Sequence, residues 1–147
     1  MGKKFKKEML IVDDSKFLRT IFSKYFENQG YKVYLASDGQ EALDLIDNRL
    51  PGNSFEAIIS DCEMPIMDGK TFIKTCRSSS YPSYNKTCII LVSSKQVKDF
   101  KEANYFFLKP LALMQVQSEI ELFWQNEQVE QSEQTDTVEV LGEESLL

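Results

Sequence analysis

The sequence contains no histidine, and this absence excludes several kinds of active site at once. The chain cannot carry a Ser-His-Asp triad, a Cys-His pair, a histidine-based zinc site or a phosphorylated histidine of its own. The three cysteines, Cys62, Cys76 and Cys88, are far apart and predict neither a disulfide framework nor a zinc site. We expect them to be buried thiols of a cytoplasmic protein. Any chemistry must therefore use carboxylates, hydroxyls or lysine.

Long apolar runs are also missing, because no segment approaches the ~20 apolar residues of a membrane helix. The basic lead at residues 1–7 is followed only by a short apolar run ending in two aspartates, which argues against a signal peptide. With 147 residues, 42% hydrophobic and 27% charged, the composition predicts one soluble globular domain. We expect no membrane association.

The net charge of −6 comes from one end of the chain. Residues 125–147 contain seven acids and no base, whereas residues 1–124 contain 17 bases and 16 acids and are nearly neutral. We predict a folded domain over residues 8–124, followed by an acidic tail or an extension of the last helix over 125–147. The charge balance then gives no evidence for DNA binding, and no output module is recognisable after Trp124.

Five short apolar runs of strand length alternate with segments of helical spacing. The runs are Met9–Val12, Val33–Ala36, Ala57–Ser60, Ile89–Val92 and Tyr105–Leu108. Four of them are nearly continuous in apolar residues, which is typical of parallel strands covered on both faces. Helix starts are indicated at Ser15, at Ser37 or Asp38, at Asp68-Gly69 and near Leu111. The pattern predicts an α/β fold of five βα units with right-handed crossovers.

The fourth crossover is unusually short. Only 12 residues, from Ser93 to Asn104, connect the fourth strand to the fifth, which is close to the minimum for a parallel crossover. We therefore expect a shortened fourth helix of two turns at most, from Gln96 to Glu102, with Phe100 as its inward residue.

Reactive side chains follow four of the five predicted strands. Asp13 and Asp14 follow the first strand, Asp61 the third, Ser93 the fourth and Lys109 the fifth. In open α/β sheets the functional crevice lies at the carboxyl ends of the strands, so these side chains should meet. Three converging carboxylates repel one another unless a cation joins them, and hard oxygen ligands suit Mg²⁺. A lysine and a hydroxyl at the same edge complete a site for a phosphoryl group.

Four segments make the chain resemble the receiver domain of two-component response regulators from residue 8 to about 124. They are Ile11-Val12-Asp13-Asp14-Ser15, the run from Ser60 to Gly69, Val92-Ser93-Ser94, and Phe106-Phe107-Leu108-Lys109-Pro110. The pattern D-x-x-M-P-x-M-D-G within the second segment is specific when it follows an apolar strand. The resemblance implies a flavodoxin-like, doubly wound sheet with strand order 2-1-3-4-5.

The resemblance also implies a role for each site residue. Asp61 matches the phosphoacceptor, which takes a phosphoryl group from a histidine of a partner kinase. Asp13 and Asp14 match the acid pair that holds Mg²⁺, together with Asp61 and the backbone carbonyl of Glu63. Ser93 matches the hydroxyl that turns toward the phosphoryl group.

Two residues near the fifth strand match further parts of the family's machinery. Lys109 matches the charge-neutralising lysine, and its bond to Pro110 is expected to be cis. Phe106 matches the switch aromatic, which follows the hydroxyl inward on phosphorylation. The lack of histidine means that another molecule, a histidine kinase or a histidine phosphotransfer protein, must supply the phosphoryl group. The resemblance further implies a downstream protein target for this chain, which the sequence does not identify.

The sequence also departs from the family pattern. Glu63 and Lys95 occupy the variable positions that tune phosphoryl hydrolysis, and an ion pair between them would screen the site. We predict a persistent phosphoryl state, which fast loss of label from the phosphoprotein would refute. The switch residue is Phe, so it has no hydroxyl to bond. The shortened fourth helix makes it unsafe to transfer the family's usual output face to this chain.

The leading hypothesis is a phosphorylation-switched binding module that is not an enzyme beyond self-phosphorylation and slow self-dephosphorylation. One alternative is a magnesium-dependent phosphatase with an aspartyl nucleophile, because Asp61-Cys62-Glu63 places a second acid two residues after the first. The usual D-x-D-x-[TV] pattern is absent, however. A flavodoxin-like nucleotide binder is a third possibility, but no glycine-rich loop follows the first strand.

Overall fold

The computed structural model describes residues 7–146, with side chains up to Glu130. Most of the predicted basic lead, and the tail side chains beyond Glu130, lie outside the described residues. The chain forms two compact units, which meet between Leu111 and Ala112 in the sequence. Within residues 7–146, no helix combines the length and apolar character needed to cross a membrane.

The first unit contains a five-stranded parallel sheet of order β2-β1-β3-β4-β5, as expected from the resemblance. Its strands are β1 (Lys7–Val12), β2 (Tyr31–Ala36), β3 (Ala57–Asp61), β4 (Cys88–Ser93) and β5 (Tyr105–Leu108). The order is 2-1-3-4-5 because the chain first moves outward to β2 and then crosses to the other side of β1. This topology places the switch point between β1 and β3, where ligands bind in open α/β sheets.

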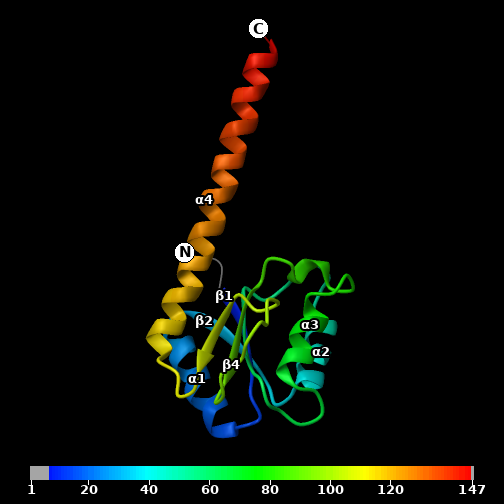
Figure 1. The fold of residues 1–147 in the computed structure, drawn as a ribbon, viewed down its shortest axis with the longest axis vertical. Helices are drawn as coiled ribbons and strands as arrows, with labels where there is room; N and C mark the ends of the chain where they lie inside the picture. Colours follow the sequence, from blue (N-terminus) through cyan, green and yellow to red (C-terminus); the bar gives the residue numbers. More distant parts are fainter. Residues whose placement is uncertain (1–6, 147) are drawn as a thin grey trace. The chain divides into compact units, whose positions relative to one another are not determined.

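Helices cover both faces of this sheet (Figure 1). They are α1 (Lys16–Asn28) on one face, and α2 (Gly39–Asp47) and α3 (Gly69–Cys76) on the other, with a short 3-10 helix, η1 (Pro82–Tyr84), after α3. Each α-helix of this unit begins at a predicted cap. Ser15, Asp38 and Asp68 each accept a hydrogen bond from a backbone N–H in the first turn of their helix.

The core follows from the alternation of side chains along each strand. Leu10 and Val12 of β1 pack on the sheet face that α2 and α3 cover. The same cluster includes Leu91 of β4, Phe72 of α3 and Leu43 of α2. Met9 and Ile11 alternate with them and are also fully buried. Because both faces of the central strands are covered, their sequences are nearly continuous in apolar residues.

The predicted two-turn helix over 96–102 is not formed. Residues 94–104 contain turns, bends and irregular loop, but no helix, between β4 and β5. Asp99 has φ 56°, which breaks any right-handed helix there, and the connection is too short to leave the sheet, form a helix and return. Phe100 nevertheless packs against the core as predicted. We call residues 94–104 the β4–β5 connection.

The second unit consists of α4 (Leu113–Leu146). This helix begins two residues later than the predicted start near Leu111, and its helical structure continues beyond Trp124 through residues 125–146. Ala112 accepts the first backbone hydrogen bonds of the helix, from Gln115 and Val116.

Candidate functional site

The register of the sheet brings the predicted site residues to one edge. Asp61 is the last residue of β3 and Ser93 the last residue of β4. Asp61 pairs with Val92, and Ser93 pairs with Leu108, the residue before Lys109. Asp13 and Asp14 follow β1 directly. Strands far apart in the sequence therefore deliver these side chains to a single site.

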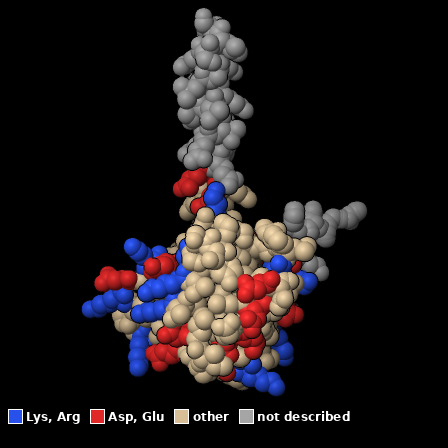
Figure 2. Space-filling model, turned by 90° about the vertical axis from the view of Figure 1, so that its right-hand side faces the viewer, with Lys and Arg blue, Asp and Glu red and all other residues tan. Residues whose placement is uncertain are grey.

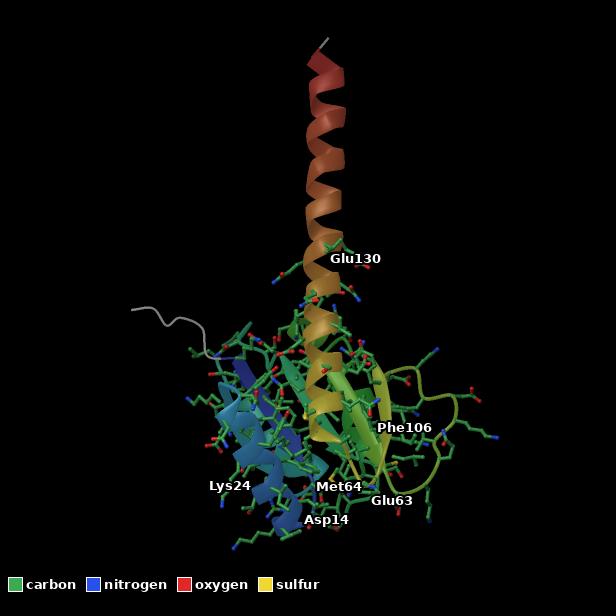
Figure 3. All side chains as sticks on the ribbon, turned by 90° about the vertical axis from the view of Figure 1, so that its left-hand side faces the viewer. Asp14, Lys24, Glu63, Met64, Phe106 and Glu130 are labelled. Carbon is green, nitrogen blue, oxygen red and sulfur yellow. The ribbon has the colours of Figure 1, made fainter. Side chains whose placement is uncertain are left out.

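Three carboxylates form the centre of this site. Asp13, Asp14 and Asp61 each place one oxygen so that all three oxygens lie within 4.8 Å of one another. Asp13 and Asp61 are buried, with relative exposures of 2% and 7%, whereas Asp14 is exposed. Figure 3 labels Asp14 and Glu63 at the same end of the molecule. The cluster offers hard oxygen donors on one open side, which is the donor set that a magnesium ion prefers.

Lys109 is the counter-charge of the two buried carboxylates. Its Nζ lies 3.2 Å from Asp13 Oδ2 and 3.2 Å from Asp61 Oδ2. Burial opposes the charge of Lys109, but the two carboxylates outweigh burial and raise its pKa. Burial and the neighbouring charge of Asp13 raise the pKa of Asp61, although Lys109 acts in the opposite direction. One lysine therefore leaves the three-carboxylate cluster with unbalanced negative charge.

The start of α1 fixes Asp13. Its Oδ1 accepts a hydrogen bond of 2.8 Å from the backbone N–H of Ser15. Its backbone carbonyl accepts one of 2.7 Å from Arg19 Nη1. Arg19 was not among the predicted site residues, because nothing in the sequence marks a basic residue one turn into a helix as a support for the preceding loop. The structure thus adds a positioning residue to the site.

The loop between β3 and α3 fixes Asp61. The N–H of Cys62 donates to the carbonyl of Val92 at 2.7 Å, and the N–H of Gly69 donates to the carbonyl of Cys62 at 2.8 Å. Gly69 approaches so closely that a Cβ atom there would overlap the carbonyl oxygen of Asp61 and lie 2.9 Å from its carbonyl carbon. The glycine of the sequence motif is therefore required by the packing of α3 on the end of β3.

The predicted switch residues lie on β4 and β5. Ser93 is buried, and its Oγ accepts a hydrogen bond of 3.1 Å from the N–H of Lys95. Its carbonyl accepts a hydrogen bond of 2.9 Å from the N–H of Lys109. Phe106 is half-buried and packs against the core. The Ser93 hydroxyl is therefore held by the β4–β5 connection.

The tuning pair does not form an ion pair. Glu63 and Lys95 are both exposed, and the ion pairs among the described residues do not join them. Each side chain is free to extend into solvent, where an ion pair gains little over hydration. The Lys109–Pro110 peptide bond is cis, as expected.

Sequence comparison identifies the class of protein that shares these features. The family described as "Response regulator receiver domain" matches residues 9–121. The transcriptional regulatory protein SrrA of Staphylococcus aureus is 30% identical over 135 residues, which cover 86% of this chain and 52% of SrrA. The response regulator MprA of Mycobacterium is 39% identical over 71 residues, covering 48% of this chain and 29% of MprA. The chain thus spans about half or less of these relatives.

Solved structures agree with this match. The chemotaxis response regulator CheY4 of Vibrio cholerae has a TM-score of 0.68 and 30% identity, and the match covers 79% of this chain and 99% of CheY4. The receiver domain of the sensor histidine kinase PA1611 of Pseudomonas aeruginosa has a TM-score of 0.69 and 22% identity, covering 81% of this chain and 98% of that domain. The second likeness concerns the fold alone.

Proposed function

The chain belongs to the response regulator receiver domain family, and from this premise we propose that Asp61 accepts a phosphoryl group and switches the binding of a partner. Receiver domains are signalling domains of two-component systems, and those of response regulators receive their signals from histidine kinases. The observation that carries the proposal is the contact of Lys109 with both Asp13 and Asp61 in a cluster of three carboxylates.

In the proposed reaction, an Asp61 carboxylate oxygen attacks the phosphorus of a phosphohistidine on the partner. A P–O bond forms while the P–N bond breaks, and the leaving imidazole nitrogen keeps the electron pair and takes up a proton. Lys109, already 3.2 Å from Asp61 Oδ2, neutralises charge on the phosphoryl oxygens. Because this chain has no histidine, the donor is a separate histidine kinase or histidine phosphotransfer protein.

Asp13, Asp14 and Asp61 would hold a magnesium ion, with the backbone carbonyl of Glu63 as a further ligand. The fit is good, because the three carboxylates supply hard oxygen donors and Lys109 balances only part of their charge. When bound, the ion supplies neutralising charge for the phosphoryl oxygens. The chain's own residues position the acceptor: Cys62 and Gly69 hold the backbone around Asp61.

The switch would begin at Ser93. Its Oγ now accepts from the N–H of Lys95, so a turn of the hydroxyl toward a phosphoryl oxygen would release that bond. Phe106 would then move inward by packing alone, since its ring has no hydroxyl. The β4–β5 connection, which starts at Ser94, would be the first segment to respond.

The proposed acceptor is tested by incubating the full chain with acetyl phosphate and Mg²⁺ and measuring the intact mass. We expect the native chain to gain one acid-labile phosphoryl group and Asp61→Asn to gain none. Asp44→Asn, which removes an exposed carboxylate of α2, serves as the matched control and should be phosphorylated normally. Equal labelling of Asp61→Asn would contradict the proposal, as would turnover of the phosphodonor without an adduct.

A persistent phosphoryl state is the second part of the proposal. Glu63 and Lys95 each lie two residues past the end of a strand, near the start of their loops, and both are exposed. They would hinder the approach of a hydrolytic water as separate side chains, without an ion pair. Loss of label over time, compared between the native chain and a Glu63→Ala, Lys95→Ala variant, tests this. We expect the variant to lose the label faster, and equal rates would contradict it.

A further inference from the structure

The β4–β5 connection leaves a pocket on the sheet face that α2 and α3 cover elsewhere. The pocket has a volume of about 190 Å³ and opens to solvent. Leu91 and Phe106 line it from the sheet, and Val97, Phe100 and Ala103 line it from the connection. It exists because eleven irregular residues take the place of a helix and cannot fill the same volume. Its walls combine apolar side chains with polar atoms, and Asn104 is among the lining residues. Its size suits one large side chain.

Two lysines of α3 lie next to Phe100, which lines this pocket, and the connection that lines it carries three more. Lys70 and Lys74, one turn apart on α3, place their Nζ atoms 5.8 Å and 6.0 Å from the centre of the Phe100 ring. Lys95, Lys98 and Lys101 project from the connection and are exposed. The ion pairs among the described residues use none of these five lysines. Their charges are therefore available to a partner. We call this surface the lysine-rimmed pocket.

The positive charge of this surface is confined to α3 and the β4–β5 connection. The α3 helix carries two lysines and no acid, and the connection carries three lysines against Asp99 and Glu102. The adjacent α2 has the opposite character, with three acids and no base. In Figure 2, many blue side chains project at the left of the view with red ones among them, and other red side chains gather at the centre right. A partner with negative charge would therefore be attracted to one side only.

We propose that the lysine-rimmed pocket is a docking site for an acidic segment of another protein that inserts one large apolar side chain. The apolar side chain would fill the pocket against Phe100 and Phe106, while carboxylates on either side of it would meet the lysines. The surface is built from α3 and the β4–β5 connection, so it needs no fourth crossover helix. Charge would favour the encounter, and the pocket would supply specificity.

A protein segment fits this surface better than a nucleic acid. Lys70 and Lys74 lie over the ring of Phe100, so a base that stacked on that side of the ring would have to displace them. The two acids of the connection would also repel a phosphate backbone. A segment with separate carboxylates can avoid them, and an apolar side chain is the group that the pocket accepts.

Binding can be measured by fluorescence anisotropy with a labelled glutamate-rich peptide that carries one central phenylalanine. A second peptide has serine in place of the phenylalanine. We expect the first peptide to bind the full chain, and the charge reversal Lys70→Glu, Lys74→Glu to weaken binding about tenfold or more. The serine peptide should bind about tenfold more weakly than the first. Ala103→Phe, which fills the pocket, should weaken binding of the phenylalanine peptide only.

The matched control is Lys16→Glu, Lys24→Glu, which reverses two exposed lysines of α1 and changes the net charge equally. It should bind as the native chain does, and circular dichroism should show all variants folded. The proposal is overturned if the α1 control loses as much affinity as the α3 variant, or if the serine peptide binds equally well. It is also overturned if a single-stranded oligonucleotide binds this surface in preference to the peptide. Phosphorylation is not needed for the measurement, so failure here leaves the role of Asp61 untouched.

Discussion

At the scale of single residues, Gly69 shows how closely the site depends on backbone packing. Any side chain at this position would meet the carbonyl of Asp61. We predict that Gly69→Ala destabilises the protein by more than about 2 kcal/mol, because backbone rather than a flexible side chain must move. It should also slow phosphorylation by acetyl phosphate, since Asp61 would be displaced. Urea unfolding and intact mass measure the two effects.

Gly52→Ala is the control for this prediction. Gly52 has φ 81°, so alanine is strained there, but no atom lies within 4 Å of the added Cβ. We expect a cost of only about 1 kcal/mol and normal phosphorylation. If both variants lost the same stability, close approach at Gly69 would not be the cause.

Ile66 is held in an unfavourable backbone conformation. It has φ 70°, a left-handed value that β-branched residues rarely adopt, and its side chain is 83% exposed. Because little packing compensates for the strain, we predict that Ile66→Asn stabilises the protein by about 1 kcal/mol. Ile66→Val keeps the β-branch and should give no gain. Thermal unfolding of the two variants checks this, and an equal gain in both would contradict it.

Glu56 gives a pH-dependent prediction. Burial raises its pKa, with Lys7 opposing and Glu8 adding to the shift. A raised pKa means that the charged form weakens the folded state, so the cost is present at neutral pH and disappears below the ordinary glutamate value of about 4.3. Glu56→Gln should therefore stabilise the protein at pH 7 by less than about 1 kcal/mol, because solvent screens the group. Urea unfolding of the native chain and the variant at pH 7 and at a pH below about 4.3 should show the gain in stability at pH 7 only.

At the scale of elements, Arg77 stabilises the region in which the predicted fourth crossover helix is not formed. From the end of α3, its guanidinium donates to the carbonyls of Tyr84 at 2.6 Å, Thr87 at 3.1 Å and Glu102 at 2.9 Å. It also donates to Asn104 Oδ1 at 2.8 Å, and this oxygen accepts from the N–H of Ile89 as well. One side chain thus ties the end of α3 to the segment before β4 and to the residues before β5.

We predict that Arg77→Lys destabilises the protein by about 2–3 kcal/mol, because an ammonium cannot reach these separate acceptors. Hydrogen exchange should speed up first in residues 84–87 and 102–105. A double-mutant cycle with Asn104→Ala should show coupling of about 0.5–3 kcal/mol, since the two residues share one network. Additive losses would contradict the network.

At the scale of the whole molecule, we expect the carboxylate cluster to couple the stability of the fold to Mg²⁺. The excess negative charge of Asp13, Asp14 and Asp61 costs folding free energy that a bound cation would remove. We predict that Mg²⁺ stabilises the native chain by about 1.4 kcal/mol at ten times its Kd, and that a chelator reverses this. Asp61→Asn should reduce the response, whereas Asp44→Asn should keep it. Thermal unfolding across a magnesium titration gives the result, and an equal response in both variants would contradict it.

Much of the fold and most of the site could be predicted from the sequence, because local patterns fix them. Apolar runs and caps such as Ser15, Asp38 and Asp68 defined the strands and helices. Each reactive residue, from Asp13 to Lys109, follows a predicted strand, so parallel pairing alone brings these residues to one edge. The helix predicted over 96–102 was wrong, since a mixed, charged connection carries no local signal that distinguishes a short helix from turns.

The sequence by itself determined the class of fold, the order of elements and which side chains meet at the end of the sheet, because these depend on periodicity and on strand direction. Only the tertiary structure decided how closely Gly69 approaches Asp61, which carbonyls Arg77 binds, and that Lys70 and Lys74 of α3 lie over Phe100 beside a pocket. These features depend on distances between residues far apart in the chain. Such distances follow from packing and from the exact path of the β4–β5 connection, neither of which any local pattern encodes.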